Sequence, residues 1–233
     1  MKKVRILSYI LLSVGMVNCM GGVKANKTAT AKEKLTEERK VQPTYETPKL
    51  LDTTYKAYLL PVKEVREQEG ELTNLKALSS SKYRSDYSYY FSNFVYFDFS
   101  KKVERVIFKN KVKILNYNYW TIDTTRVLVF EGWNKDTNKD GKLNADDLSR
   151  LFVYYVKEDV LKAYDIEHTT VLDVTPMVGT DLIYVQLGED SNRDNVFDRA
   201  SEPKKIKVID VKNKEIKDLI SKDNQTLIEN NLK

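Results

Sequence analysis

Oxygen-bearing side chains recur at alternate positions of one segment in the middle of the chain. This segment reads Asp136-Thr137-Asn138-Lys139-Asp140-Gly141-Lys142-Leu143-Asn144-Ala145-Asp146-Asp147. Calcium takes about six to eight oxygen ligands, and a calcium loop supplies them from its positions 1, 3, 5, 7, 9 and 12. The spacing therefore predicts a Ca2+ site whose ligands are Asp136, Asn138, Asp140, the backbone carbonyl of Lys142, Asn144 and Asp147.

Other residues of this segment also suit a calcium loop. Gly141 stands at the sixth position, where the chain turns sharply and glycine adopts a positive φ at little steric cost. Asp147 replaces the glutamate usual at position 12, and its shorter side chain predicts a lower affinity. Asp146 is expected either to assist at the ion or to cap a helix over Ala145 to Leu151. The competing interpretation is an ordinary surface turn, since Asp, Asn and Gly are common turn residues.

A second segment downstream repeats the pattern less closely. It reads Asp190-Ser191-Asn192-Arg193-Asp194-Asn195-Val196-Phe197-Asp198-Arg199-Ala200-Ser201-Glu202. Asn195 replaces the glycine, and Asn enters the left-handed region more readily than most side chains. The twelfth residue, Ser201, is a poor ligand, and the carboxylate of Glu202 comes one residue later. The predicted ligands are Asp190, Asn192, Asp194, the backbone carbonyl of Val196, Asp198 and Glu202, and the alternative is a solvated turn.

Strand-like sequences enter and leave both segments. Val127–Trp133 and Asp181–Leu187 are short runs rich in β-branched and aromatic residues, and neither has a helical pattern. Leu151–Val156 and Lys205–Val211 follow the two segments. An EF-hand has a helix on each side of its loop. We therefore predict a different repeated unit, made of a strand, a calcium loop, a strand, a turn and a strand.

These features resemble a known group of proteins. Both loops have a D-x-N-x-D core, a hydrophobic residue at position 8 and flanking strands. In this they are similar to surface-exported lipoproteins of Bacteroidota that carry EF-hand-like calcium loops. The resemblance covers Val127 to Ile220 and implies export and calcium binding. Ser201 departs from the acidic residue that the resemblance implies at that position.

The amino terminus predicts export. Residues 1–18 combine basic residues with an apolar run from Ile6 to Val17, which is too short to span a bilayer and is typical of a signal peptide. Cys19, the only cysteine, stands where a lipoprotein is cleaved and lipidated. We therefore expect a lipid anchor at Cys19, in an outer or surface-exposed membrane of the cell envelope. The alternative is cleavage after Ala25, which would leave a periplasmic or secreted protein.

Composition divides the rest of the chain. Residues 19–50 contain few large apolar side chains and are predicted to form a flexible tether. Residues 51–233 are predicted to form a single β-rich calcium-binding domain. The full chain has 39 basic and 34 acidic residues, and three of the basic ones lie in the predicted signal peptide. Because the remaining charges are nearly balanced and interspersed, we expect no nucleic-acid partner.

The predicted fold class is mainly β, with antiparallel sheets arranged as a sandwich or as a few propeller-like blades. The expected strands are Tyr55–Leu60, Tyr89–Phe99, Arg105–Phe108, Val112–Leu115, Arg126–Trp133, Leu151–Val156, Val160–Tyr164, Asp181–Leu187, Lys205–Val211 and Ile216–Ile220. Hairpin turns are expected at Lys109–Lys111, Lys157–Asp159 and Lys212–Lys214. Few short helices are expected, one of them at Val62–Gln68.

The segment Tyr87–Phe99 is rich in aromatic residues. Alternating aromatic residues in a strand usually pack in a core, with Tyr hydroxyls at its rim. The alternative is an exposed aromatic face that binds a glycan or a protein partner, with calcium as a scaffold.

Little in the sequence indicates catalysis. His168 is the single histidine, which excludes zinc sites built from several histidines and cysteines. No Gly-x-Ser-x-Gly elbow accompanies it. The two Asp-rich segments account for the densest clusters of acidic residues, so we expect a calcium-binding protein that is not an enzyme.

Overall fold

The computed structural model describes residues 41–66 and 90–232. The predicted signal peptide, Cys19, Ala25 and most of the predicted tether lie outside these residues, as do Tyr87, Ser88 and Tyr89 of the aromatic segment. Within the two described ranges, no helix has the length and apolar character needed to cross a membrane.

Thirteen strands and one helix form the described part of the chain. The first five strands are β1 (Val41–Tyr45), β2 (Lys49–Asp52), β3 (Ala57–Arg66), β4 (Phe91–Asp98) and β5 (Val103–Val106). The next four are β6 (Lys113–Ile122), β7 (Thr125–Trp133), β8 (Arg150–Tyr155) and β9 (Val160–Tyr164). The last elements are β10 (Thr169–Pro176), β11 (Leu182–Glu189), β12 (Lys204–Asp210), β13 (Glu215–Asp218) and α1 (Lys222–Asn231).

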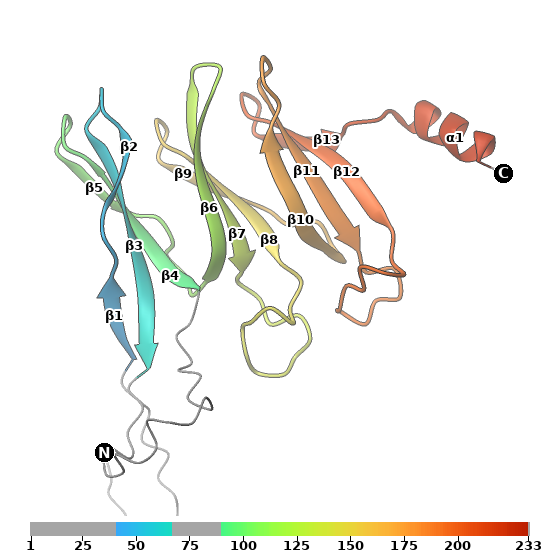
Figure 1. Cartoon of the computed structure of the whole chain (residues 1–233), viewed down its shortest axis with the longest axis horizontal. Helices are drawn as coiled ribbons and strands as arrows, with labels where there is room; N and C mark the ends of the chain where they lie inside the picture. The colour runs from blue at the N-terminus through green and yellow to red at the C-terminus, as the bar shows by residue number, and fades with distance from the viewer. Residues whose placement is uncertain (1–40, 67–89, 233) are drawn as a thin grey trace, which may run out of the picture. The chain divides into compact units, whose positions relative to one another are not determined.

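Antiparallel pairing divides twelve of these strands into three meanders of four. Strands β2 to β5 pair in chain order, and so do β6 to β9 and β10 to β13 (Figure 1). Strand β1 pairs with β3 beyond the end of β2. The first two meanders join in one sheet through the pair Phe91↔Ile114 of β4 and β6, while the third forms its own sheet.

Four hairpins of these meanders end in the same kind of turn. The paired residues that close them are Asp52↔Ala57, Asp98↔Val103, Tyr155↔Val160 and Asp210↔Glu215. In each, the last residue of the turn has a positive φ: Lys56, Lys102, Asp159 and Lys214. Where the turn begins with aspartate, the carboxylate accepts backbone N–H groups of the turn. A turn of this type therefore joins the third and fourth strands of every meander.

The central strands of the second meander, β7 and β8, are buried on both faces. On β7, Leu128 and Phe130 point into one hydrophobic core, and Val127 and Val129 point into another. Side chains alternate between the faces of a strand, so a run in which every residue is buried indicates cover on both sides. Because these four residues are all apolar, β7 can lie between two layers.

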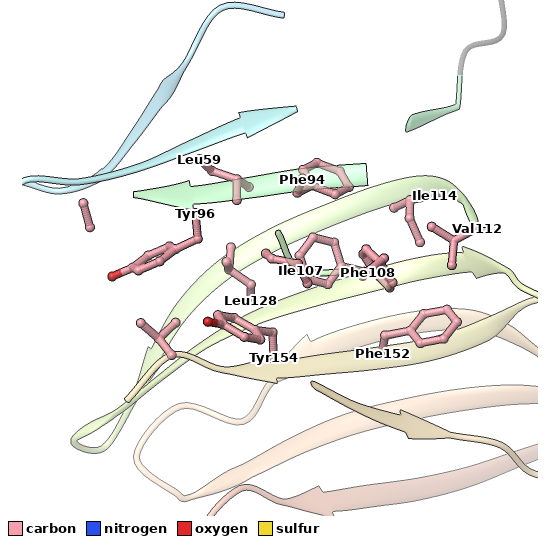
Figure 2. Packing of buried hydrophobic residues seen from close by; sticks show 13 residues of the cluster. Leu59, Phe94, Tyr96, Ile107, Phe108, Val112, Ile114, Leu128, Phe152 and Tyr154 are labelled. Atoms are coloured by element: carbon pink, nitrogen blue, oxygen red, sulfur yellow. The ribbon is translucent and has the colours of Figure 1, made fainter. Parts of the chain in front are cut away.

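The first core lies between the first and second meanders. It contains buried residues of β3 and β4 on one side and of β6, β7 and β8 on the other (Figure 2). The second core joins β7 and β8 to the third meander, with Ile183 and Ile209 among its fully buried residues. The second meander therefore contributes residues to both cores.

The structure confirms the predicted fold class, which was mainly β with antiparallel sheets. The turns at 157–159 and 212–214 are hairpins as predicted. Lys109–Lys111 is not, because it connects β5 to β6 and these strands do not pair with each other. The predicted helix at Val62–Gln68 is wrong over its described part, because β3 continues to Arg66 by pairing with β1.

Three strand regions were not predicted, and one of them is the part of β6 after Leu115. Strands β1 and β2 begin inside the predicted tether of residues 19–50, so regular structure starts no later than Val41. Strand β10 was missed as well, because Asp173 and a register shift beside it interrupt the apolar alternation. In each case, pairing with a neighbouring strand outweighs a weak local pattern.

Candidate calcium loops

The two Asp-rich segments occupy equivalent places in two meanders. The first, which we call loop 1, is residues 136–147 and connects β7 to β8. The second, loop 2, is residues 190–202 and connects β11 to β12. Each therefore joins the second and third strands of its meander, and a turn and the fourth strand follow. This order confirms the predicted strand arrangement around the loops.

The first half of loop 1 folds around its own acceptor side chains. Asp136 Oδ2 accepts the N–H of Gly141 at 2.8 Å, and its Oδ1 accepts that of Asp140 at 3.2 Å. Asn138 Oδ1 accepts the same Asp140 N–H at 3.1 Å. Asp140 Oδ1 accepts the N–H of Lys142 at 2.7 Å. The loop winds tightly because Lys139 and Gly141, its fourth and sixth residues, have φ values of 63° and 81°.

Asp147 closes loop 1. One carboxylate oxygen accepts the N–H of Thr137 at 2.6 Å, and the other accepts that of Asn144 at 3.0 Å. The residue is only 5% exposed, and the Asp147 carbonyl accepts a hydrogen bond from Trp133 Nε1 at 2.9 Å. The last predicted ligand thus ties the start, the end and the preceding strand together. Asp147 reaches both halves of the loop even though aspartate is shorter than glutamate.

The first half of loop 2 has the same arrangement. Asp190 accepts the N–H groups of Asp194 and Asn195 at 3.1 and 3.0 Å. Asn192 Oδ1 accepts the N–H of Asp194 at 2.9 Å, and Asp194 Oδ1 accepts that of Val196 at 2.8 Å. The fourth and sixth residues again have positive φ values, and Asn195 takes the place of glycine with a φ of 66°. The same fold of the backbone forms on a different sequence.

Glu202 closes loop 2. Its Oε1 accepts the N–H of Ser191 at 2.9 Å, and its Oε2 accepts that of Asp198 at 2.9 Å. Ser201 does not reach the loop entrance, and its hydroxyl donates to Asp198 Oδ2 at 2.7 Å. This bond, with the N–H of Ala200 donating to the same carboxylate, lowers the pKa of Asp198.

The structure brings the predicted ligands together loop by loop. In loop 1, Asp136, Asn138, Asp140, Asn144 and Asp147 all accept backbone N–H groups of the loop. In loop 2, Asp190, Asn192, Asp194, Asp198 and Glu202 do the same. The helix expected over Ala145 to Leu151 is absent from the described residues, because turns lead directly into β8. Asp146 therefore caps no helix, and its N–H donates to Asn144 Oδ1 at 2.7 Å.

The predicted ligands of the two loops suit a hard cation. Among the residues that the structure describes, no three His, Cys, Asp or Glu side chains gather into a compact metal cluster. A calcium loop does not need such a cluster, because amide and backbone oxygens supply part of its ligands. A carboxylate oxygen has two lone pairs, so one that accepts an N–H keeps acceptor capacity for an ion. Every side chain predicted to bind the ion in either loop would do so through an oxygen atom.

Two residues near the loops had no predicted role there. His168 has a φ of 54°, and its carbonyl accepts the N–H of Asp190 at 2.9 Å. Its Nδ1 lies 3.6 Å from Asp190 Oδ2, so it contacts the first predicted ligand of loop 2. Trp133 donates to the carbonyl of Asp147, the last predicted ligand of loop 1. Both contacts arise from tertiary packing, and no sequence spacing indicates them.

A cavity of about 380 Å³ lies between the two loops. Asp146 and Asp147 line it from loop 1, and Phe197 and Arg199 line it from loop 2. Glu131 of β7 also lines it, and burial raises the pKa of this carboxyl, although the Asn116 side chain donates to it at 3.3 Å. The loops are therefore neighbours in the fold.

Comparison of the chain with protein-family models, with curated proteins and with solved structures finds no match.

Proposed function

We propose that the protein is an exported, lipid-anchored calcium-binding protein in which Ca2+ stabilises the connections between strands. One observation carries this proposal. Two segments of different sequence and length adopt the same hydrogen-bonded winding around oxygen side chains at the positions that a calcium loop uses. An ordinary surface turn has no need for five acceptor side chains in a fixed order, and still less for a second copy of them.

Calcium would act by mass action on the folded state. Extracellular calcium modules have dissociation constants of about 10⁻⁴ to 10⁻³ M. With about 1 mM calcium, a site at the tight end of this range adds about 1.4 kcal/mol to the free energy of unfolding. Two such sites add about twice that. The gain matters because the chain has a single cysteine and therefore no intramolecular disulfide.

The proposed anchor is the lipidated thiol of Cys19. The supporting observation is its place directly after the apolar run of the signal peptide. A Cys19→Ser variant should lose a metabolic lipid label and leave the membrane fraction, whereas the unchanged chain should keep both. Retention of the label in the variant would contradict the anchor, and a chain that begins at Asn26 would support the alternative cleavage after Ala25.

Calorimetric titration tests the calcium proposal. The purified protein should bind two Ca2+ ions. The pairs Asp136→Ala with Asp140→Ala, and Asp190→Ala with Asp194→Ala, should each remove one ion from the stoichiometry. The matched control is Asp218→Ala, which removes an exposed carboxylate of β13 that lies outside both loops. Two ions bound by either pair variant would contradict the assignment of that loop.

A second candidate function is binding of a glycan or a protein partner. Part of the aromatic segment packs inward, because Phe94 and Tyr96 are buried in the first core. Phe97 and Phe99, however, stack at 5.8 Å, and Tyr58 meets Phe99 edge to face at 5.5 Å. Phe99 is 60% exposed, so this cluster offers an aromatic surface.

A glycan array compared between the unchanged protein and Phe99→Ala tests this second candidate. Binding that disappears in Phe99→Ala while two calcium ions remain bound would favour a binding module with calcium as its scaffold. Binding that is unchanged in the variant would exclude this aromatic cluster as the contact surface.

A further inference from the structure

Ser149, just after loop 1, is hydrogen-bonded to the start of the third meander. Ser149 lies two residues after Asp147, the last ligand of loop 1, and is 5% exposed. Its N–H donates to Thr170 Oγ1 at 3.1 Å, and the two hydroxyls lie 2.9 Å apart. The N–H of Val171 in turn donates to Ser149 Oγ at 3.0 Å. The residue two positions after loop 1 is therefore bonded to the second and third residues of β10.

The same residues of β10 lead to loop 2. His168 lies two residues before Thr170, and its carbonyl accepts the N–H of Asp190 at 2.9 Å. Thr169, between them, is paired with Glu189 in the β10–β11 register. Asp190 is the first ligand of loop 2 and is 1% exposed. Two hydrogen-bonded steps, Ser149 to Thr170 and His168 to Asp190, and the short backbone segments between them thus connect the last ligand of one loop to the first ligand of the other.

This route is shielded from water for most of its length. Ser149, Thr169 and Asp190 are all buried. Hydrogen bonds in such surroundings are stronger than exposed ones, and a partner that is lost leaves a costly unsatisfied group. Displacement of Ser149 would therefore disturb Thr170 and the start of β10. The preceding residue, His168, accepts the N–H of Asp190.

We propose that calcium in loop 1 raises the calcium affinity of loop 2, with Ser149 and Thr170 as the residues that transmit the effect. This coupling rests on the proposed calcium function. An ion in loop 1 fixes Asp147 and so orders the shared start of β10. A second ion then binds a loop whose first ligand is already in place, which requires less ordering. By linkage, calcium in loop 2 raises the affinity of loop 1 by the same factor.

The sign of the effect separates this route from direct electrostatics. Two cations repel each other, so an interaction through space between the ions lowers the affinity of the second site. Coupling through Ser149 and Thr170 raises it. A measured increase therefore supports the hydrogen-bonded route.

Four proteins test the proposal by calcium titration calorimetry. They are the unchanged chain, the loop 1 variant Asp136→Ala with Asp140→Ala, Thr170→Val, and Thr170→Val combined with the loop 1 variant. In the chain that keeps Thr170, disabling loop 1 should weaken loop 2 by about fivefold or more, at the lower end of known couplings. In the Thr170→Val background, which keeps the side-chain shape but lacks the hydroxyl, the same change should weaken loop 2 by less than about twofold. As a further control beyond these four proteins, Thr170→Ser with and without the loop 1 variant should restore the coupling.

The outcomes distinguish failure of the coupling from failure of the function. An equal loop 2 affinity with and without a working loop 1 would overturn the coupling while calcium binding stands. Full coupling in Thr170→Val would overturn the route through this hydroxyl. No heat of binding in any of the four proteins would overturn the calcium function itself. Thermal unfolding in EDTA checks that each variant folds. If Thr170→Val does not fold, Ser149→Ala takes its place in the experiment.

Discussion

Glu202 holds in loop 2 the position that Asp147 holds in loop 1. Each carboxylate accepts the N–H of the second residue of its loop with one oxygen and that of the ninth residue with the other. Loop 2 has one more residue before its closing carboxylate, and that carboxylate belongs to the longer glutamate side chain. The departure at Ser201 is therefore a change of spacing that a change of side chain compensates.

This equivalence predicts which residue closes loop 2. Glu202→Gln keeps the size of the side chain but removes its charge, and it should weaken calcium binding at loop 2 by about tenfold or more, since charge count tunes the affinity of such loops. Ser201→Ala removes only a hydroxyl that donates to Asp198, and its effect should be less than about threefold. Calorimetry on both variants decides the matter, and a larger loss in Ser201→Ala would contradict the assignment.

Trp133 should report on loop 1. Its indole N–H donates to the carbonyl of Asp147, so an ion that reorganises this residue changes the surroundings of the ring. Calcium should therefore alter the intrinsic fluorescence, and the change should vanish in Trp133→Phe and in Asp136→Ala with Asp140→Ala. The chain's other tryptophan, Trp120, provides the control, because Trp120→Phe should leave the calcium signal intact. A signal that follows Trp120 would argue against the prediction.

Gly188 leaves room for the ring of Phe197 in loop 2. A Cβ atom at this position would lie 2.4 Å from the ring of Phe197, the hydrophobic residue at position 8 of the loop. Gly188→Ala should thus displace the ring, lower stability by about 1–3 kcal/mol and weaken calcium binding at loop 2. Because the obstacle is a side chain, adding Phe197→Leu should recover part of both losses, as measured by denaturant unfolding and calorimetry.

Gly132 provides the contrasting case for this prediction. A Cβ atom there would lie 2.1 Å from the carbonyl oxygen of Lys113, which is backbone. Trimming a neighbouring side chain cannot relieve that contact, so Gly132→Ala should be more damaging than Gly188→Ala and should resist rescue. Equal losses of stability in Gly132→Ala and Gly188→Ala would show that these close contacts do not determine the loss.

Acid should reveal how much the turn between β12 and β13 contributes to the stability of the fold. The N–H and then the side-chain amide of Asn213 donate to Asp210, and with Lys217 they lower its pKa to about 2. A carboxyl whose pKa is lower in the folded state stabilises the fold fully above its ordinary pKa, about 4, and loses this effect as the pH falls towards 2. Stability between about pH 4 and pH 2, measured by denaturant unfolding in EDTA, should fall less steeply in Asp210→Asn than in the unchanged protein. Identical slopes would contradict this role.

The places of the two loops between strands were predictable because the pattern that marks each loop is local. The predicted ligands of each loop lie within about thirteen consecutive residues, and strands enter and leave both loops as predicted. Most strands were predictable for a similar reason, and Val160–Tyr164 matches β9 to the residue. Strand β1 was not, because Pro43 and the polar residues around it give no strand pattern and only pairing with β3 makes the strand.

Contacts between distant residues could not be predicted from the sequence. Every residue of Val127–Phe130 is buried, which indicates a strand but not the two layers that cover it. The bond between Ser149 and Thr170 joins residues 21 positions apart on different meanders, and no periodic pattern marks either one. Such features follow from how the meanders pack, and a single sequence contains no local signal for them.

Calcium titration of the purified protein, with thermal unfolding in calcium and in EDTA, tests the central claim most directly. We predict two bound ions with dissociation constants of about 10⁻⁴ to 10⁻³ M and a higher melting temperature in calcium. The absence of any heat of binding, together with equal melting temperatures in calcium and in EDTA, would contradict the calcium function.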